Sequence, residues 1–264
     1  MRHVALQSAN LNVMQKAAEK AARGLKRDFG EVEQLQVTQK GPADFVTNAD
    51  LRTEKILMEE LQKARPDYGF FMEEGGPIEG ADKIHRWIID PIDGTTNFMH
   101  GIPHFAIFIA LERSGEIIAG LVYDPIKEET FTAEKGAGAY LNDKRLRVSG
   151  RKHLNEIVLA TGIPFKGHGN TEKFSSQLSR AMAETSGVRR FGAASLDLAY
   201  VAAGRYDGYW EDNLSPWDIA AGIILVREAG GVVNELNGGS AMMQSGSILA
   251  TNMVLFSPLR QLLG

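Results

Sequence analysis

The chain has 264 residues, a formal net charge of −4 and no cysteine, with 44% hydrophobic and 23% charged residues. This composition excludes a disordered chain, and the mild acidity disfavours a dedicated nucleic-acid-binding protein, which usually presents a basic face. The absence of cysteine excludes a disulfide scaffold, a cysteine-ligated metal site and a thiol nucleophile. No signal-peptide core is found, and the longest apolar run, residues 105–111, is far shorter than the ~20 residues that span a bilayer, so a cytoplasmic location is expected.

The first half of the chain predicts two helices followed by strands. Apolar residues recur every three or four positions between residues 11 and 25, which indicates an amphipathic helix, and a second helix is expected from about residue 48 to 64. Short strands are expected at residues 69–71 and 87–89, the latter ending at Asp90. An antiparallel meander is then predicted, with strands at residues 105–112, 117–123 and 129–133.

In the second half, strands and helices alternate. The predicted strands lie at residues 157–160, 207–211, 232–233 and 248–249. The predicted helices lie at residues 171–183, 195–203, 216–229 and 254–263. Because helices and strands interleave around an antiparallel block, we expect a layered α/β (α+β) fold rather than a simple parallel doubly wound sheet. No linker divides the chain, so one unit over residues 1–264 is expected, with approximate halves at 1–150 and 151–264.

The residues that indicate chemistry are acidic. Residues 90–98 (DPIDGTTNF) follow an apolar strand and place Asp90 and Asp93 around an Asp-Gly turn, where both can reach one cation. Carboxylate oxygens suit Mg²⁺ or Mn²⁺ rather than zinc. If residues 94–96 open a helix, its free N–H groups would hold an anion such as phosphate. The alternative interpretation is a plain turn followed by a helix cap.

Three other acidic segments each have a structural and a metal-binding interpretation. The adjacent carboxylates of Glu73 and Glu74 repel each other, so they are either solvated or neutralised by cations. Asp218 and Asp50 each lie at the start of a predicted helix, where a carboxylate either compensates the helix dipole or binds a metal from a rigid element.

The paired segments at residues 90–98 and 217–231 (WDIAAGIILVREAGG) resemble the signatures of the inositol monophosphatase family of Mg²⁺-dependent, lithium-sensitive phosphatases. The same order and spacing are met at residues 44–50 (DFVTNAD), Glu73-Glu74, 122–125 (VYDP) and 192–198. The resemblance covers about residues 3–262 and is strongest to the bacterial, SuhB-like members. It implies an αβαβα layered sandwich of the sugar-phosphatase type, a single catalytic unit and a homodimer.

The resemblance also implies which residues bind metal. Glu73, Asp90 and the backbone carbonyl of Ile92 would hold a first ion. Asp90, Asp93 and Asp218 would hold a second ion, with Asp90 shared between the two. Glu73 would also help to hold a third, weaker ion. The implied cofactor is Mg²⁺, as two or three ions per site, with Mn²⁺ as a possible substitute.

Roles in catalysis and substrate binding follow from the same resemblance. Thr95, paired with Asp50, would orient and help to deprotonate the attacking water, and Glu73 joins this catalytic set through the third ion. The backbone N–H groups of Gly94 and Thr95 would bind the phosphate. The alcohol part of the substrate would contact Asp93, Gly192, Ala194 and Glu211.

The activity implied by these motifs is hydrolysis of a small polyol phosphate, with inositol 1-phosphate favoured because Glu211 lies seven residues before Asp218, the spacing of the family's inositol-contacting glutamate. Related signatures occur in phosphatases of fructose 1,6-bisphosphate, histidinol phosphate, NADP and 3′-phosphoadenosine nucleotides, which are alternatives. A further hypothesis is a regulatory partner of RNA polymerase in ribosomal RNA transcription, with phosphatase activity secondary. Neither direct nucleic-acid binding nor membrane binding is expected.

Overall fold

The computed structural model describes residues 8–31, 37–41, 44–165 and 169–264, and only the backbone of residues 37–41 and 44–45. The side chains of Asp44 and Phe45, which open the predicted motif at residues 44–50, therefore lie outside the described part. None of the described helices is both long and apolar enough to cross a membrane.

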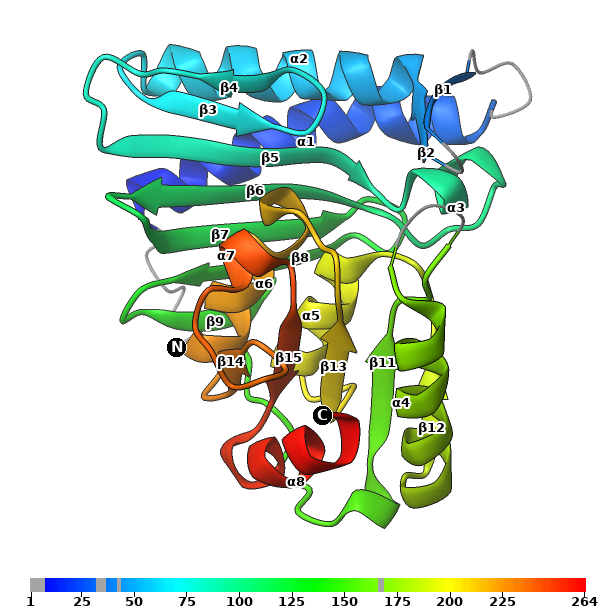
Figure 1. Ribbon diagram of the computed structural model, residues 1–264. Helices are drawn as coiled ribbons and strands as arrows, with labels where there is room; N and C mark the ends of the chain where they lie inside the picture. The colour runs from blue at the N-terminus through cyan, green and yellow to red at the C-terminus, as the bar shows by residue number, and fades with distance from the viewer. Residues whose placement is uncertain (1–7, 32–36, 42–43, 166–168) are drawn as a thin grey trace.

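The outermost layer consists of α1 (Ala9–Phe29) and α2 (Asn48–Ala64), which lie along one face of the first sheet (Figure 1). Each helix has a side-chain cap, because Ser8 accepts the Leu11 N–H at 3.2 Å and Thr47 opens α2 with a capping box. The apolar positions predicted at residues 11–25 form the buried face of α1. This result confirms the first predicted helix.

Within the described residues, the first sheet has eight strands in the order β10-β9-β8-β7-β6-β5-β3-β4. In chain order they are β3 (Gly69–Met72), β4 (Gly76–Ile78), β5 (His85–Asp93), β6 (Ala106–Arg113), β7 (Glu116–Asp124), β8 (Glu129–Glu134), β9 (Gly138–Leu141) and β10 (Lys144–Arg145). Neighbours from β5 to β10 pair antiparallel, which confirms the predicted meander, whereas β3 and β5 run parallel. A separate hairpin of β1 (Val37–Gly41) and β2 (Asp44–Thr47) precedes α2.

The second sheet, in the part of the chain that the structure describes, has five strands in the order β12-β11-β13-β15-β14. They are β11 (Val158–Thr161), β12 (Gly187–Arg189), β13 (Gly208–Glu211), β14 (Val232–Asn234) and β15 (Ile248–Thr251). The outer face of this sheet packs against α4 (Thr171–Glu184) and α8 (Met253–Leu263) around Leu159, Trp210 and Leu249. Short helical turns lie at η2 (Leu154–Glu156) and α7 (Met242–Ser245).

Between the two sheets lie α5 (Ala194–Ala202) and α6 (Pro216–Glu228), and their side chains share one core with strands of both sheets. Eight consecutive residues of α6, 219–226, are buried, so this helix is apolar on every side. Gly222 lets α5 approach α6 closely, since a Cβ there would lie 2.3 Å from Leu198 Cδ1. The layers are therefore helix, sheet, helix, sheet, helix, which confirms the predicted αβαβα sandwich.

Candidate active site

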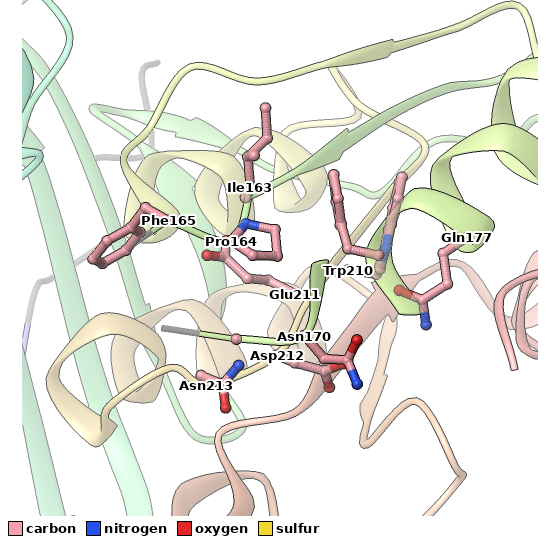
Figure 2. Close-up of a pocket in the computed structure, with 12 residues that line it drawn as sticks. Ile163, Pro164, Phe165, Asn170, Gln177, Trp210, Glu211, Asp212 and Asn213 are labelled. Atoms are coloured by element: carbon pink, nitrogen blue, oxygen red, sulfur yellow. The ribbon is translucent and has the colours of Figure 1, made fainter. Parts of the chain in front are cut away.

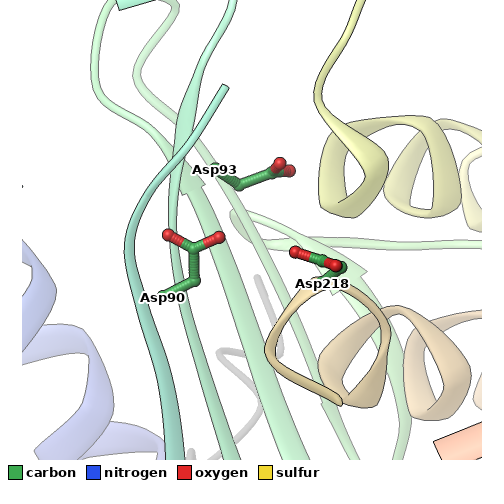
Figure 3. Close-up of side chains that lie close together, drawn as sticks. All are labelled: Asp90, Asp93 and Asp218. Atoms are coloured by element: carbon green, nitrogen blue, oxygen red, sulfur yellow. The ribbon is translucent and has the colours of Figure 1, made fainter. Parts of the chain in front are cut away.

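Among the described residues, three aspartates from two distant parts of the chain meet at the carboxyl end of β5. Asp90 and Asp93 belong to β5, whereas Asp218 lies in the first turn of α6. One carboxylate oxygen from each residue lies within 4.8 Å of the others. Figure 3 shows the three carboxyl groups around the space between β5 and α6. The structure thus brings together three of the residues that sequence analysis assigned to metal binding.

An irregularity in β5 explains how two aspartates three positions apart reach the same space. In a regular strand, such residues would point to opposite faces of the sheet. Asp90 pairs with Phe108 of β6 and Asp93 pairs with Ala106, so β5 has one extra residue between these pairs, as in a β-bulge. The Ile92 N–H donates to Asp90 Oδ1 at 2.8 Å and fixes the bulged backbone. The expected end of this strand at Asp90 is therefore wrong, because the pairing resumes at Asp93.

Asp93 also joins β5 to the central helix layer. Its Oδ2 accepts the Ser195 backbone N–H at 2.8 Å and the Ser195 hydroxyl, in the first turn of α5. The N-cap residue of α5, Ala193, has no capping side chain of its own, so Asp93 fills that role from another part of the chain. Burial raises the pKa of Asp93 to about 6, and the hydrogen bonds from Ser195 oppose this rise.

Asp218 is held by the start of its own helix. Its Oδ2 accepts the Ser215 backbone N–H at 2.6 Å in a capping box, and Pro216 occupies the first helical position. Burial raises the pKa of Asp218 well above its usual value, and the charge of Asp93 raises it further. The carboxylate is thus fixed on a rigid, buried helix.

Glu73, which follows β3, completes the acidic cluster. It is half-buried, and its backbone N–H donates to the Ile89 carbonyl of β5 at 3.1 Å. The pKa of Asp90 is raised far above its usual value, first by burial and then by the Glu73 carboxylate, with which Asp90 shares a hydrogen bond. Of the adjacent glutamates, Glu73 therefore faces the cluster, whereas the Glu74 backbone is bonded to the Glu54 side chain at 2.9 Å.

Asp50 and Thr95 form a polar pair beside these carboxylates. The Thr95 hydroxyl lies 3.2 Å from Asp50 Oδ1 and 3.0 Å from the Ile92 carbonyl oxygen. The other oxygen of Asp50 accepts the Thr47 N–H at 2.8 Å within the capping box of α2. Burial raises the pKa of Asp50, and hydrogen bonds from Thr47 and Thr95 oppose this rise. The helix start that carries Asp50 thus also positions Thr95.

The turn after β5 leads directly into a short helix. Gly94 has φ 97°, in the left-handed region that favours glycine, and it is the N-cap of the short helix α3 (Thr95–Met99). A Cβ at Gly94 would also lie 3.1 Å from the His104 carbonyl oxygen. Since first-turn N–H groups of a helix have no partner within it, they remain available to an anion.

Glu211, at the end of β13, faces the acidic cluster from the second sheet. Its Oε2 accepts the Tyr209 hydroxyl, and burial raises its pKa to about 7. Gly162 makes room for this carboxylate, since a Cβ there would lie 1.9 Å from Glu211 Oε1. Beside it opens a pocket lined partly by Ile163 and Phe165, as Figure 2 shows.

The other two residues assigned to the alcohol part of the substrate lie at the start of α5. Gly192 has φ 81°, and Ala194 is the first residue of that helix, directly before Ser195. Asp93 reaches this same helix start, so the segment lies next to the acidic cluster. The structure therefore places Gly192 and Ala194 close to Asp93.

Comparison with known proteins agrees with this geometry. The family model described as "Inositol monophosphatase family" matches residues 6–262. The chain belongs to the inositol monophosphatase family. It is 58% identical to "Inositol-1-monophosphatase" of Mesorhizobium japonicum, over 94% of this chain and 93% of that protein. It is 48% identical to "Nus factor SuhB" of Vibrio cholerae, over 92% of this chain and 91% of that protein.

A solved relative has the same fold as this member of the inositol monophosphatase family. The crystal structure of extragenic suppressor protein suhB from Bartonella henselae matches with a TM-score of 0.94 and 56% identity. The match covers 97% of this chain and 98% of that one. The two-sheet arrangement described above is therefore the fold of the family.

The acidic cluster of this inositol monophosphatase family member has the properties of a cation site. Asp90 and Asp218 are both held at raised pKa values because each is buried beside other carboxylates. Such a group of charges is stable only when it is protonated or neutralised by cations. Carboxylate and carbonyl oxygens are the ligands that Mg²⁺ and Mn²⁺ prefer, so the residues present fit such ions.

Sequence analysis missed several residues that build the site. Ser195 and Gly162 act on Asp93 and Glu211 across large sequence separations, so no local pattern reveals them. Asp197 was also missed: it is 1% exposed, and its Oδ1 has no hydrogen-bond partner among the described residues. Its pKa is raised by burial and by the nearby charge of Glu211. His104 is 7% exposed and packs against Phe191.

Proposed function

We propose that this protein is an inositol-1-monophosphatase, which hydrolyses a small polyol phosphate to the free alcohol and inorganic phosphate. The observation that carries this proposal is the meeting of the Asp90, Asp93 and Asp218 carboxylate oxygens within 4.8 Å. The relatives named inositol-1-monophosphatase, at 56–58% identity, support the same substrate class.

The proposed cation ligands follow the sequence motifs. Glu73, Asp90 and the Ile92 carbonyl would hold one ion, and Asp90, Asp93 and Asp218 a second. Mg²⁺ is the proposed ion, with Mn²⁺ as a substitute and a third, weaker ion near Glu73. Bound divalent cations neutralise the substrate dianion, lower the pKa of a bound water and stabilise the leaving alkoxide. Four carboxylates bring a formal charge of −4, which two such ions balance.

The protein's own groups would orient and deprotonate the attacking water. The Thr95 hydroxyl oxygen would accept a proton from the water, and the Asp50 carboxylate, 3.2 Å away, would accept the hydroxyl proton in turn. The water oxygen then bonds to phosphorus as the bond from phosphorus to the alcohol oxygen breaks. No covalent bond to the protein is needed in this scheme.

Substrate recognition would be divided between two segments. The backbone N–H groups of Gly94 and Thr95 would donate to the phosphate oxygens. Asp93, Gly192, Ala194 and Glu211 would contact the alcohol. The Glu211 carboxylate, fixed by the Tyr209 hydroxyl, is an acceptor suited to the hydroxyl groups of a polyol.

Phosphate release by purified protein, with Mg²⁺ or with EDTA, tests this proposal. The substrates are inositol 1-phosphate, fructose 1,6-bisphosphate, histidinol phosphate, NADP and 3′-phosphoadenosine 5′-phosphate. We expect Mg²⁺-dependent turnover that is highest on inositol 1-phosphate, inhibited by Li⁺, and lost in Asp93→Asn. Higher turnover on another substrate would overturn the substrate assignment, and near-native turnover of Asp93→Asn would overturn the site.

A matched control for Asp93→Asn is Asp207→Asn. Asp207 is also a buried carboxylate, and it accepts the Val158 N–H at 2.8 Å and pairs with Arg151 at the opposite end of β13 from Glu211. Its neutralisation removes the ion pair with Arg151 and should therefore weaken the fold without touching the cluster. We therefore expect Asp207→Asn to retain turnover wherever it remains folded.

A regulatory role is a second candidate, favoured by the relatives named Nus factor SuhB at 44–48% identity. In this case the chain would bind RNA polymerase through a surface separate from the acidic cluster. A pulldown with purified RNA polymerase should then retain wild type and Asp93→Asn equally. Absence of binding by either protein would overturn this role.

We also propose a homodimer, on the basis of the sequence resemblance. Sedimentation equilibrium should then give a mass near twice the 28.9 kDa of one chain. A mass near 28.9 kDa at micromolar concentration would contradict it.

A further inference from the structure

One buried side-chain amide connects the two segments that flank the proposed substrate space. Asn97, in α3, is 6% exposed. Its Nδ2 donates to the His104 carbonyl oxygen at 2.8 Å and to the Phe191 carbonyl oxygen at 2.7 Å, and the Gly192 carbonyl oxygen lies 3.5 Å away. The bond to Phe191 joins residues 94 positions apart in the sequence.

The chemistry of this contact is specific for a primary amide. The Asn97 nitrogen carries two hydrogens, and the two closest carbonyl oxygens accept one each. A carboxylate in the same place has no donor and would repel both carbonyl groups. The orientation of the amide is thus fixed by its surroundings, and the two carbonyl groups are held at a defined separation.

The joined segments are those that bind different parts of the substrate in the proposed function. α3 begins at Thr95, next to the N–H groups proposed for the phosphate, whereas Gly192 and Ala194 are proposed for the alcohol. These segments are in close contact, since a Cβ at Gly94 would lie 3.4 Å from the Ala193 Cβ. The Asn97 amide nitrogen is occupied by backbone carbonyls and is therefore not available to contact substrate.

We propose that Asn97 is a positioning residue that sets the distance between the phosphate-binding turn and the alcohol-binding segment. This inference rests on the proposed function of the site. Without the amide, the His104 and Phe191 carbonyl groups lose their donor, and the segment that carries Gly192 moves relative to α3. Binding of the alcohol then weakens, while the phosphate and its N–H donors remain aligned.

A comparison of two substrates tests this role in Asn97→Ala. Inositol 1-phosphate engages both segments, whereas p-nitrophenyl phosphate has the same phosphate but no hydroxyl groups for Gly192 or Glu211 to contact. We expect KM for inositol 1-phosphate to rise roughly tenfold or more, since misplacement by about 1 Å can cost about 100-fold. We expect kcat and KM for p-nitrophenyl phosphate to change by less than about threefold, within the scatter expected of an unaffected site.

Asn252 provides a matched control. It is 7% exposed, and its Nδ2 donates to the Ser149 and Arg151 carbonyl oxygens, both at 2.9 Å, at the start of α8. Asn252→Ala removes an equivalent amide away from the proposed substrate space. This variant should lower the melting temperature but leave KM for inositol 1-phosphate unchanged. Asn97→Ser, which keeps one donor, is the milder variant if Asn97→Ala does not fold.

The results of these assays distinguish the positioning role of Asn97 from the proposed function. Equal effects of an Asn97 variant on both substrates, or an unchanged KM for inositol 1-phosphate, would overturn the positioning role while leaving the proposed function intact. Wild-type protein that releases no phosphate from inositol 1-phosphate would overturn the proposed function, and this inference with it.

Discussion

Replacing Asp93 by asparagine should stabilise the metal-free protein at neutral and alkaline pH while removing its stabilisation by Mg²⁺. Burial raises the pKa of Asp93 from 3.8 to about 6 in the folded state. A carboxyl group whose pKa is raised by folding destabilises the folded protein once the pH rises above 3.8, the pKa in the unfolded chain. The full destabilisation is reached above about pH 6. Asparagine carries no charge and therefore avoids this cost.

The magnitude follows from the size of the shift. A rise from 3.8 to about 6 is about 2 pKa units, which at ~1.4 kcal/mol each gives about 3 kcal/mol. The side chain is 8% exposed, so solvent screening reduces this value little. Asparagine keeps an oxygen that accepts the Ser195 N–H. For a chain of this length, about 3 kcal/mol corresponds to a rise in melting temperature of roughly 6–12 °C.

Thermal unfolding followed by circular dichroism provides the measurement. In EDTA, Asp93→Asn should melt above wild type at pH 8, and the difference should shrink towards pH 4. With Mg²⁺ at ~100 times its Kd, wild type should gain about 2.7 kcal/mol and the variant much less. A variant that melts below wild type in EDTA at pH 8 would refute the electrostatic reasoning. Asp207→Asn, the off-site control, should lower the melting temperature in both solutions.

Four other substitutions test separate parts of the site. Thr95→Ala should lower kcat by roughly 10²–10⁴-fold while leaving stabilisation by Mg²⁺ unchanged, and a kcat near wild type would exclude Thr95 from proton transfer. Gly162→Ala, whose Cβ would lie 1.9 Å from Glu211 Oε1, should raise KM for inositol 1-phosphate as Glu211→Gln does. An unchanged KM in both would remove Glu211 from substrate binding. Gly94→Ala should lower stability by about 1–2 kcal/mol because φ is 97°, as denaturant titration would measure.

The long elements of the fold were predictable because their local pattern is strong. The periodic apolar positions of α1 and the apolar residues of α6 each indicated a helix, and the β-rich segments of β6 to β8 indicated a meander. The elements that sequence analysis missed are short: β4 has three residues including Pro77, and β12 has three residues at a sheet edge. These strands exist because a neighbouring strand offers hydrogen bonds, and that neighbour is known only from the tertiary structure.

In the site, too, features with a local sequence pattern could be predicted, whereas features that depend on tertiary contacts could not. The motif at residues 90–98 predicted a turn with convergent carboxylates, and the structure places Asp90 and Asp93 together through a bulge that no local signal specified. The contact of Asp93 with Ser195 spans 102 positions and could not be derived from spacing. The hydrogen bond between Tyr209 and Glu211 could have been predicted, since residues two apart in a strand share a face.

The distance between Asp90 and Asp218 along the sequence determines when the complete ion site can assemble during protein synthesis. The chain has 264 residues, so more than four-fifths of it must be synthesised before Asp218 leaves the ribosome. Because N-terminal segments generally begin to fold first, α1, α2 and most of the first sheet can form before Asp218 is available. The proposed ligands of the first ion, Glu73, Asp90 and the Ile92 carbonyl, all belong to this early part, whereas the proposed second ion must wait for Asp218.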